Sequence, residues 1–506
     1  MEPVAVDELR WSIRLRSRLR SIRRASAAPV DDRTTIKTSV AARWVLIAAS
    51  AGYVILFTRL TLRNHYGFGT FGFDLGIFDQ GMWLLSRLKE PFVTVRGLNL
   101  FGDHSSFILL PLVPFYWLFD SAAVLLVAQS VALGAGAIPA FLIGREKLRD
   151  ERLACLIALS YLAIPALGWT NVEQFHPDAF EVPVALFALY FMFVRRWRPF
   201  LAFVVLLLLI KEDVALLTVP LGIYVAVRYD RRIGVLTTVG SAAWFALNQW
   251  VILPSFGEGA VNYGGRVTDQ FGGYGGFIET VFRRPWEIVR IALGPERPAY
   301  LWQLLAPLAL LPLLAPGLLL VSIGPLLSNT LSTFGYQHSI HYHYSTLIIP
   351  ILVAAAVVGI ARFRSNQIRT ALVLLMTASS LMTGYAWGAV GPDGQPVGDP
   401  GSPTSAAIRN AIEVIPDDAS VSAIYNAVPH LAHRVHIYEF PNPWRAVNWA
   451  DGSHAGERLP FADEIQYIVV PDEMEAEEQE IVDELLVSGY STVHNVDGYL
   501  VLRKER

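Results

Sequence analysis

The chain has 506 residues, of which 53% are hydrophobic and only 17% are charged. Together with a mean hydropathy of +0.40, this composition excludes an ordinary soluble protein and indicates a polytopic helical membrane protein. The single cysteine, Cys155, excludes a disulfide framework or a cysteine-based metal site within one chain.

Residues 1–40 are predicted to lie in the cytoplasm. They are rich in arginine and have no apolar stretch of the kind that marks a signal peptide. Between Trp11 and Ile22 the apolar residues fall on one helical face, which is typical of a basic amphipathic helix on an anionic membrane surface. The alternative is a basic tail without regular structure.

Eleven apolar segments follow within residues 41–390, and each is predicted to be a transmembrane helix. They lie at 42–62, 123–143, 153–169, 178–194, 199–210, 213–227, 233–253, 299–314, 316–334, 344–361 and 369–389. A further segment, 107–119, contains two prolines and at ~1.5 Å per residue is only about 20 Å long, so we expect it to be re-entrant or steeply tilted. The predicted fold is an all-α polytopic membrane domain with about 11–13 transmembrane helices.

Basic clusters set the predicted orientation of these helices. Four loops between apolar segments are rich in Lys and Arg, namely 145–152, 195–198, 228–232 and 362–369. The positive-inside rule places all four in the cytoplasm, so the remaining loops face outward. Eleven spans that start inside then place the C-terminal segment on the outer side of the cell membrane.

Residues 391–506 are predicted to form a small, acidic, extracytoplasmic α/β domain. They begin with a stretch rich in Pro and Gly and carry 20 acidic but only 7 basic residues. Helix-like and strand-like segments alternate along them, with helices at 405–415 and 473–489 and strands at 420–425, 433–440, 465–470 and 498–504. No phosphate-binding loop or catalytic motif occurs in this sequence, so a structural or partner-docking role is expected.

The first outer loop holds two acids, Asp74 and Asp79. On a helix their spacing of five residues would set them about 140° apart. Ionisable groups at a membrane edge are usually functional when they line a cavity. The alternative for Asp74 is that it caps a short helix, because Asp is a favoured N-cap residue.

Four further groups of polar residues fall in loops predicted to face outward. The candidate binding residues are Asp103 and His104; Glu173, His176 and Asp178; Lys211, Glu212 and Asp213; and His341 and His343. Each group also has a structural interpretation, since His-Pro-Asp fits the start of a helix and Lys–Glu pairs can be purely structural. The spacing of His338, His341 and His343 suggests a metal site, although histidines at a membrane interface are the commoner explanation.

Together these groups predict a polar cavity on the outer face, covered by loops 63–105 and 254–298. The second loop is rich in glycine and contains Arg266, so we expect it either to order on ligand binding or to be a flexible linker. The chain has no G-x-x-x-x-G-K-[ST] loop, which argues against an ATP-driven pump. It also has no cytoplasmic segment large enough to bind a nucleotide sugar.

Five motifs occur together within about residues 50–440, namely FGFDLGIFDQGMWLL, GDHSSFILLPLVPFYWLF, EQFHPDAFEVP, KEDVALL and HYHYSTLIIP. On these motifs the chain resembles the prokaryotic membrane-protein family catalogued as domain of unknown function 2079. That family is similar to the GT-C glycosyltransferase superfamily. The resemblance implies a multispanning, inverting hexosyl- or pentosyltransferase that takes sugar from a polyprenyl-phosphate donor and passes it to an extracytoplasmic glycan, lipid or protein.

The same resemblance implies roles for particular residues. Asp74, with Asp79 second, matches the first-loop acid that serves as general base or metal ligand. Lys211 is the candidate to stabilise the leaving phosphate, and Arg266 is a candidate closing contact. Asp74 is followed by Leu75 where several GT-C families have a second acid, so a divalent metal is an open expectation and no other cofactor is implied.

A transporter or flippase for a lipid-linked or anionic solute is the alternative function. It is favoured by ionisable residues such as Lys211 between apolar segments and by the interruptions at 107–119 and 199–227. Both hypotheses name a lipid bilayer as a partner, and neither involves a nucleic acid.

Overall fold

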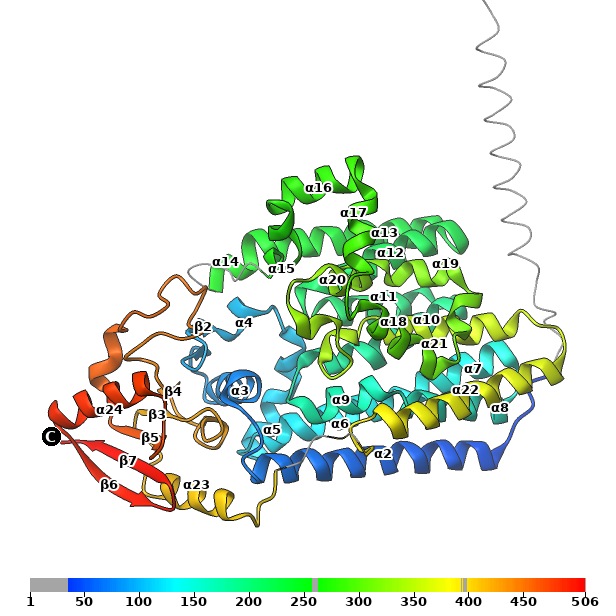
Figure 1. Cartoon of the computed structure of the whole chain (residues 1–506). Coiled ribbons are helices and arrows are strands. Elements are labelled where there is room, and N and C mark those ends of the chain that lie inside the picture. Colours follow the sequence, from blue (N-terminus) through cyan, green and yellow to red (C-terminus); the bar gives the residue numbers. More distant parts are fainter. Residues whose placement is uncertain (1–34, 257–262, 393, 395–397, 506) are drawn as a thin grey trace, which may run out of the picture.

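The computed structural model describes residues 35–256, 263–392, 394 and 398–505. A bundle of helices packs against a smaller sheet domain at the C-terminal end of the chain (Figure 1). The amphipathic helix predicted near the N-terminus falls in residues 1–34 and lies outside the described residues.

All eleven predicted apolar segments form helices or interrupted helices. The bundle consists of α2 Val40–Tyr66, α6 Ala123–Ala135, α7 Ala137–Leu148, α8 Glu151–Leu162, α9 Pro165–Glu173, α10 Glu181–Phe193, α11 Trp197–Leu208, α12 Ala215–Arg228, α13 Arg231–Leu247, α18 Arg297–Leu305, α19 Pro316–Leu319, α20 Ile323–Leu331, α21 Ile349–Ala361 and α22 Asn366–Trp387. The breaks have local causes, since α9 and α19 both begin with a proline, which supplies no N–H to a preceding helical turn.

Few of these helices span a membrane as one straight piece. By length and composition four apolar stretches of the described chain can cross a bilayer, namely Val40–Tyr66, Ala123–Leu148, His343–Ala361 and Asn366–Trp387. The pair α8 and α9 counts as a fifth if its 45° bend lies within one span. The proline-containing segment forms a 3₁₀ turn, Phe107–Leu112, continued by the short helix α5 (Val113–Leu118).

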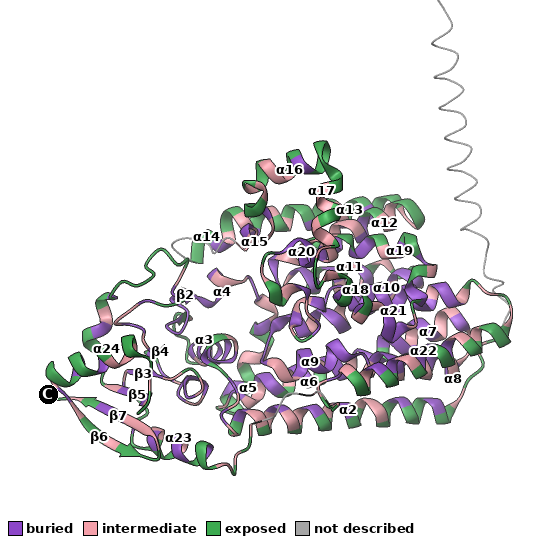
Figure 2. Cartoon of the chain, in the orientation of Figure 1, coloured by how far each residue is buried: buried purple, intermediate pink, exposed green. Residues whose placement is uncertain are grey.

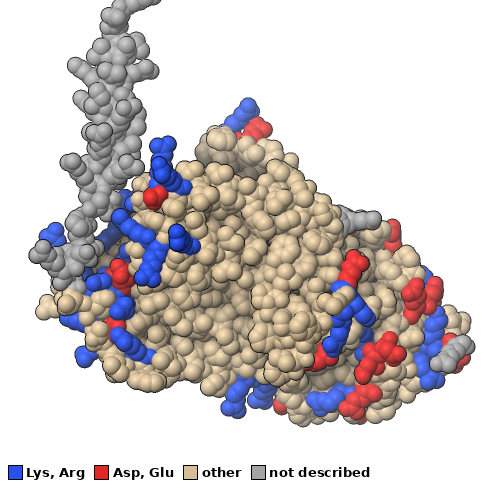
Figure 3. Space-filling model, turned by 180° about the vertical axis from the view of Figure 1, so that it is seen from behind, with Lys and Arg blue, Asp and Glu red and all other residues tan. Residues whose placement is uncertain are grey.

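The outer surface of the bundle has the character of a lipid-facing surface. Large apolar side chains are exposed on α2 and α22, among them Trp44 at 66% and Met382 at 72%. By contrast, α21 is almost wholly buried in the middle of the bundle (Figure 2). On the face shown in Figure 3, charged side chains are sparse in the middle, and Lys and Arg gather towards one end. This distribution suits a membrane-embedded belt with a basic rim.

Three of the four basic loops lie together at one end of the bundle. Lys147 lies over the ring of Phe193, at 4.1 Å from its centroid. Arg195 lies over the ring of Tyr229 at 5.8 Å. These contacts join the loops after α7, α10 and α12 on a single side.

The C-terminal domain is built on a five-stranded mixed sheet. Its strand order is β4-β3-β5-β7-β6, with bounds β3 Val421–Ala423, β4 Ile437–Glu439, β5 Tyr467–Pro471, β6 Tyr490–Val496 and β7 Tyr499–Lys504. β3 pairs in parallel with β4 and β5, whereas β7 pairs antiparallel with β5 and β6. The helices α23 (Pro403–Glu413) and α24 (Ala476–Val487) complete it, so the domain is α/β as predicted.

The loop between α2 and α5 (residues 67–112), which is predicted to face outward and is called the first outer loop, folds against this domain. It contains an irregular turn, Gly72–Gly76, and then α3 Ile77–Ser86, the hairpin of β1 Phe92–Val93 and β2 Leu98–Asn99, and α4 Leu100–Asp103. Buried residues of the loop and of the sheet domain form one continuous apolar cluster, for example Leu75 and Met82 with Val421 and Val428. The C-terminal domain is therefore packed onto the membrane domain and is not a separate tethered unit.

The glycine-rich outer loop contains several short helices. They are α14 Leu253–Phe256, α15 Gly265–Thr268, α16 Gly273–Arg283 and α17 Pro285–Ala292. Residues 257–262 within this loop lie outside the described part of the chain. The described remainder is largely helical, whereas the sequence suggested either a loop that orders on ligand binding or a flexible linker.

Candidate functional site

Asp74 lies in the irregular turn between α2 and α3. Its backbone has φ 76° and ψ −92°, a conformation that residues with a side chain rarely adopt. Strain of this kind is common at functional sites. Helix α3 begins after Gly76 and has no side-chain cap, so Asp74 does not act as the N-cap that the alternative interpretation proposed.

The Asp74 carboxylate faces a pair of stacked histidines. Its Oδ1 lies 3.3 Å from Nε2 of His176, and the Asp74 side chain remains 36% exposed. The rings of His176 and His343 stack with centroids 3.6 Å apart. Glu173 closes the group, because its Oε2 accepts the backbone N–H of His343 at 3.0 Å. Four residues from three separate loops thus meet at one point.

Glu173, His176 and His343 have the arrangement of a metal-binding group. Their ligand atoms all lie within 4.8 Å of one another, and no other group of three such residues was found in the described part of the chain. Both ring nitrogens of His176 and Nδ1 of His343 are buried and have no hydrogen-bond partner among the described residues. Two imidazoles and a carboxylate are donors that suit a zinc-like divalent ion.

The histidine spacing that first suggested a metal does not itself form the group. His338 pairs with Glu296 at 3.5 Å, and His341 is exposed and packs edge-on against Trp169. Only His343 of the three reaches the cluster.

His176 is held as a cation by its surroundings. Burial alone would lower its pKa, but the neighbouring carboxylates Asp74 and Glu173 raise the pKa of His176 to about 9. Without a metal ion, the ring is therefore protonated at neutral pH, and the Asp74 contact is an ion pair.

A buried ion pair lies next to this group. Lys211, at the break between α11 and α12, places its Nζ 3.1 Å from Oδ1 of Asp178, and each side chain is 8% exposed. Glu212 instead accepts a hydrogen bond from Nδ1 of His104 at 2.8 Å. Asp213 keeps a buried Oδ1 with no hydrogen-bond partner among the described residues. The charged triplet therefore connects two polar clusters.

Loop residues cover the other side of these clusters. Tyr263 donates a hydrogen bond to Asp103 at 2.6 Å and stacks on the ring of His104. Arg266 lies over the rings of Tyr263 and Phe334, at 4.8 and 4.1 Å. The glycine-rich loop thus reaches Asp103 and His104 through Tyr263.

Arg96 is a site residue that sequence patterns did not identify. Its Nε lies 3.8 Å from Asp103, and its guanidinium lies 5.6 Å from the centroid of the Phe73 ring. Its Nη1 donates to the backbone oxygens of Asn448 and Ala450 in the C-terminal domain. No motif marks an isolated arginine in a hairpin, so only the fold assigns it to the site.

Asp79 lies apart from the Asp74 cluster. It is 1% exposed, accepts the Tyr116 hydroxyl at 2.8 Å, and lies 3.1 Å from Nε2 of His433. Although burial opposes the charged form, Asp79 and Asp120 raise the pKa of His433 above its ordinary value. Asp79 thus contributes to an ion-pair network between the first outer loop and the C-terminal domain.

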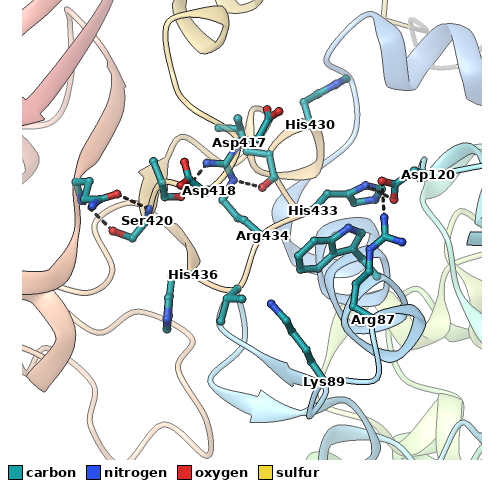
Figure 4. Close-up of a pocket in the computed structure, with 15 residues that line it drawn as sticks. Arg87, Lys89, Asp120, Asp417, Asp418, Ser420, His430, His433, Arg434 and His436 are labelled. Carbon is teal, nitrogen blue, oxygen red and sulfur yellow. Dashed lines mark hydrogen bonds and ion pairs between the residues drawn. The ribbon is translucent and has the colours of Figure 1, made fainter. Parts of the chain in front are cut away.

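His433 lines an open cavity of about 690 Å³ between α3 and the C-terminal domain. His433 and Arg87 both point at Asp120, at 3.0 and 2.8 Å, as Figure 4 shows. Lys89 enters the cavity from the end of α3. Both acidic and basic side chains line this cavity. It lies at the interface of the first outer loop and the C-terminal domain, and His176 and His343 do not line it.

The structure therefore sorts the predicted residues into three sets. The Asp74 cluster and its adjoining ion pair bring together Asp74, Glu173, His176, His343, Asp178 and Lys211. A second group, linked to it through the Lys211–Asp213 triplet, holds His104, Glu212, Asp213, Asp103 and Arg266. Asp79 and His341 lie outside both groups.

These features define a multi-pass helical membrane protein with a polar site beside a packed sheet domain. Residues 64–501 match the family model described as "Predicted membrane protein (DUF2079)", so the chain belongs to that family. None of the curated proteins compared with the chain matches it.

The fold matches solved structures of ArnT from Cupriavidus metallidurans. The apo structure has a TM-score of 0.53 and 14% identity, and covers 92% of this chain and 98% of the ArnT chain. The structure of ArnT bound to undecaprenyl phosphate gives the same TM-score and coverage at 13% identity. The expected fold is therefore confirmed as a likeness to ArnT.

Proposed function

We propose that the protein is a membrane glycosyltransferase that transfers a sugar from a polyprenyl-phosphate donor to an extracytoplasmic acceptor. The observation that carries this proposal is the strained, partly exposed Asp74 beside the buried cations His176 and Lys211, in a fold shared with a protein that binds undecaprenyl phosphate. A carboxylate and cations in one place match the two charges that develop during glycosyl transfer.

The proposed reaction is a single displacement at the anomeric carbon. Asp74 takes the proton of the acceptor hydroxyl, and the acceptor oxygen attacks the sugar with inversion. The bond between the sugar and the phosphate oxygen breaks, and the electron pair leaves with the polyprenyl phosphate. Lys211 and His176 stabilise the negative charge of the leaving phosphate, and Arg266 contacts the donor from the glycine-rich loop.

A divalent metal ion is part of the proposal as an optional component. Glu173, His176 and His343 would hold it, since their buried ring nitrogens have no hydrogen-bond partners among the described residues. Such an ion would supply further neutralisation of phosphate charge. Metal analysis of the purified protein should find an ion that the double variant His176→Ala/His343→Ala lacks; equal metal content in both proteins would reject this site.

Asp74→Asn tests the proposed base. With purified full-length protein and an undecaprenyl-phosphate sugar, we expect transfer to fall by about 10²- to 10⁴-fold, the usual contribution of a general base. Glu473→Gln is the matched control, because Glu473 is an exposed carboxylate of the C-terminal domain. Full activity of Asp74→Asn would show that the base is another group.

We also propose a topology with segment 1–40 in the cytoplasm and segment 391–506 outside. The basic loops gathered at one end of the bundle support it. The only cysteine, Cys155, is buried. A cysteine placed at the exposed Ser453 should therefore be labelled by an impermeant thiol reagent in intact cells, and labelling only after lysis would reverse the orientation.

A transporter is the second candidate, and one observation favours it. The buried Lys211–Asp178 pair adjoins two carboxylate oxygens, on Glu181 and Asp213, that have no hydrogen-bond partner among the described residues. Unpaired buried carboxylates are typical of ion or proton pathways. Flux of a lipid-linked sugar across proteoliposomes without sugar transfer would support this function over the first.

A further inference from the structure

The C-terminal domain contacts the turn that carries Asp74. The backbone N–H of Gly72 donates to the carbonyl oxygen of Tyr425 at 2.7 Å. The carboxylate of Glu439 lies against the same residue, because a Cβ atom on Gly72 would come within 2.6 Å of its Oε2. The turn just before the strained Asp74 is thus in contact with both Tyr425 and Glu439 of the sheet domain.

Glu439 is placed for this contact by the fold of the domain. It is the last residue of β4, the edge strand of the five-stranded sheet. Its Oε2 is buried and has no hydrogen-bond partner in the described part of the chain. Burial and the nearby Asp74 raise the pKa of the Glu439 carboxyl to about 7. Burial of a carboxylate without full hydrogen bonding costs free energy. Its presence at this position therefore indicates a local role.

The turn fits this surface closely. A Cβ atom on Gly72 would lie 2.6 Å from Oε2 of Glu439 and 2.9 Å from Cβ of Val428. A Cβ atom on Gly76 would approach the Val428 side chain at 3.2 Å. The glycines on either side of Asp74 therefore let the turn lie against the C-terminal domain.

We propose that Glu439 is a positioning residue for Asp74, so that the C-terminal domain completes the active site. The contact of the Glu439 side chain with Gly72, beside the hydrogen bond from Gly72 to Tyr425, holds the backbone in the unusual conformation that aims the Asp74 carboxylate at His176. This inference rests on the proposed function only for the role of Asp74 in transfer. The positioning itself is a property of the turn.

Two substitutions of Glu439 separate its contact with the turn from its charge. Glu439→Gln keeps the shape of the side chain that lies against Gly72, whereas Glu439→Ala removes it. In the full-length protein we expect Glu439→Ala to lower kcat by about tenfold or more with little change in the KM for an undecaprenyl-phosphate sugar, since small misplacements of a catalytic group are costly. Glu439→Gln should stay close to the wild type, as should the control Glu473→Ala.

Hydrogen exchange provides a readout that does not depend on activity. The Gly72 and Phe73 amides should exchange faster in Glu439→Ala and at the wild-type rate in Glu439→Gln. Unchanged exchange and kcat in Glu439→Ala would overturn the inference, and so would equal losses in both Glu439 variants. If the wild type transfers no sugar, the proposed function fails, but the exchange rates still decide whether Glu439 holds the turn.

Discussion

Burial of Glu439 lowers the free energy of unfolding by an amount that depends on pH. Its folded pKa of about 7 lies above the ordinary value of 4.5, because burial and Asp74 disfavour the ionised form. Below pH 4.5 the carboxyl is protonated in the folded and the unfolded chain, so it makes no difference to stability. As pH rises from 4.5 to 7, only the unfolded chain loses its proton freely, and the free energy of unfolding falls.

We therefore expect Glu439→Gln to be more stable than the wild type above pH 7. A shift of this size corresponds to a gain of up to about 3 kcal/mol at pH 8, vanishing near pH 4.5. Thermal unfolding of the two proteins in detergent at both pH values measures this difference. A Tm difference that is the same at pH 4.5 and pH 8 would contradict the buried ionisation.

The two acids of the first outer loop show which properties of a single residue can be predicted from the sequence and which cannot. Their spacing on a helix predicts different directions, and the structure directs Asp74 to His176 and Asp79 to Tyr116 and His433. The residue types alone do not say which acid is buried. Burial of Asp79 depends on His433, a partner 354 positions away, and single-sequence patterns contain no information about such a pair.

The turn Gly72–Gly76 is the element on which the site depends most directly. Gly72→Ala would push a Cβ atom into Glu439 and Val428, so the turn must move off the C-terminal domain. We expect this variant to lose at least about tenfold in kcat, because Asp74 moves with the turn. Sugar transfer by the purified variant measures the loss.

Gly275→Ala provides the comparison for this element. An added Cβ there meets nothing within 4 Å, and Gly275 lies in the exposed helix α16 of the glycine-rich loop. It should keep wild-type activity, and its stability should be unchanged or slightly raised, since alanine favours a helix over glycine. Equal kcat values for Gly72→Ala, Gly275→Ala and the wild type would show that the turn tolerates displacement.

Elements with a strong local signal were predictable. Apolar runs of sufficient length predicted the helices of the bundle, and proline predicted the short, interrupted segment that forms α5. β6 was missed, because Tyr490–Val496 is mostly polar and exposed and its pairing with β7 is set by the sheet. The helices α15–α17 were also missed, because a glycine-rich sequence indicates a flexible backbone. In the structure, packing against Phe334 and the α20 region orders the described part of this loop.

One apolar cluster is shared by the first outer loop and the C-terminal domain. Leu75 and Met82 of the first outer loop are fully buried against residues such as Val421 and Val428 of the C-terminal domain. Composition identified the acidic domain but could not show where it docks, because docking depends on contacts between distant parts of the chain. The sequence left a structural or a partner-docking role open for this domain, and the contact that the structure shows for it is with the first outer loop.

Removing the C-terminal domain should therefore disable the site without touching its histidines. A chain ending at residue 390 would expose the buried face of the first outer loop and lose Tyr425 and Glu439, which contact Gly72. We expect no sugar transfer and rapid proteolysis within residues 67–105, while the bundle stays protected. Because the bundle has its own core, α21 supplies an internal control for its integrity. Undiminished transfer by the truncated protein would show that the membrane domain builds a complete site alone.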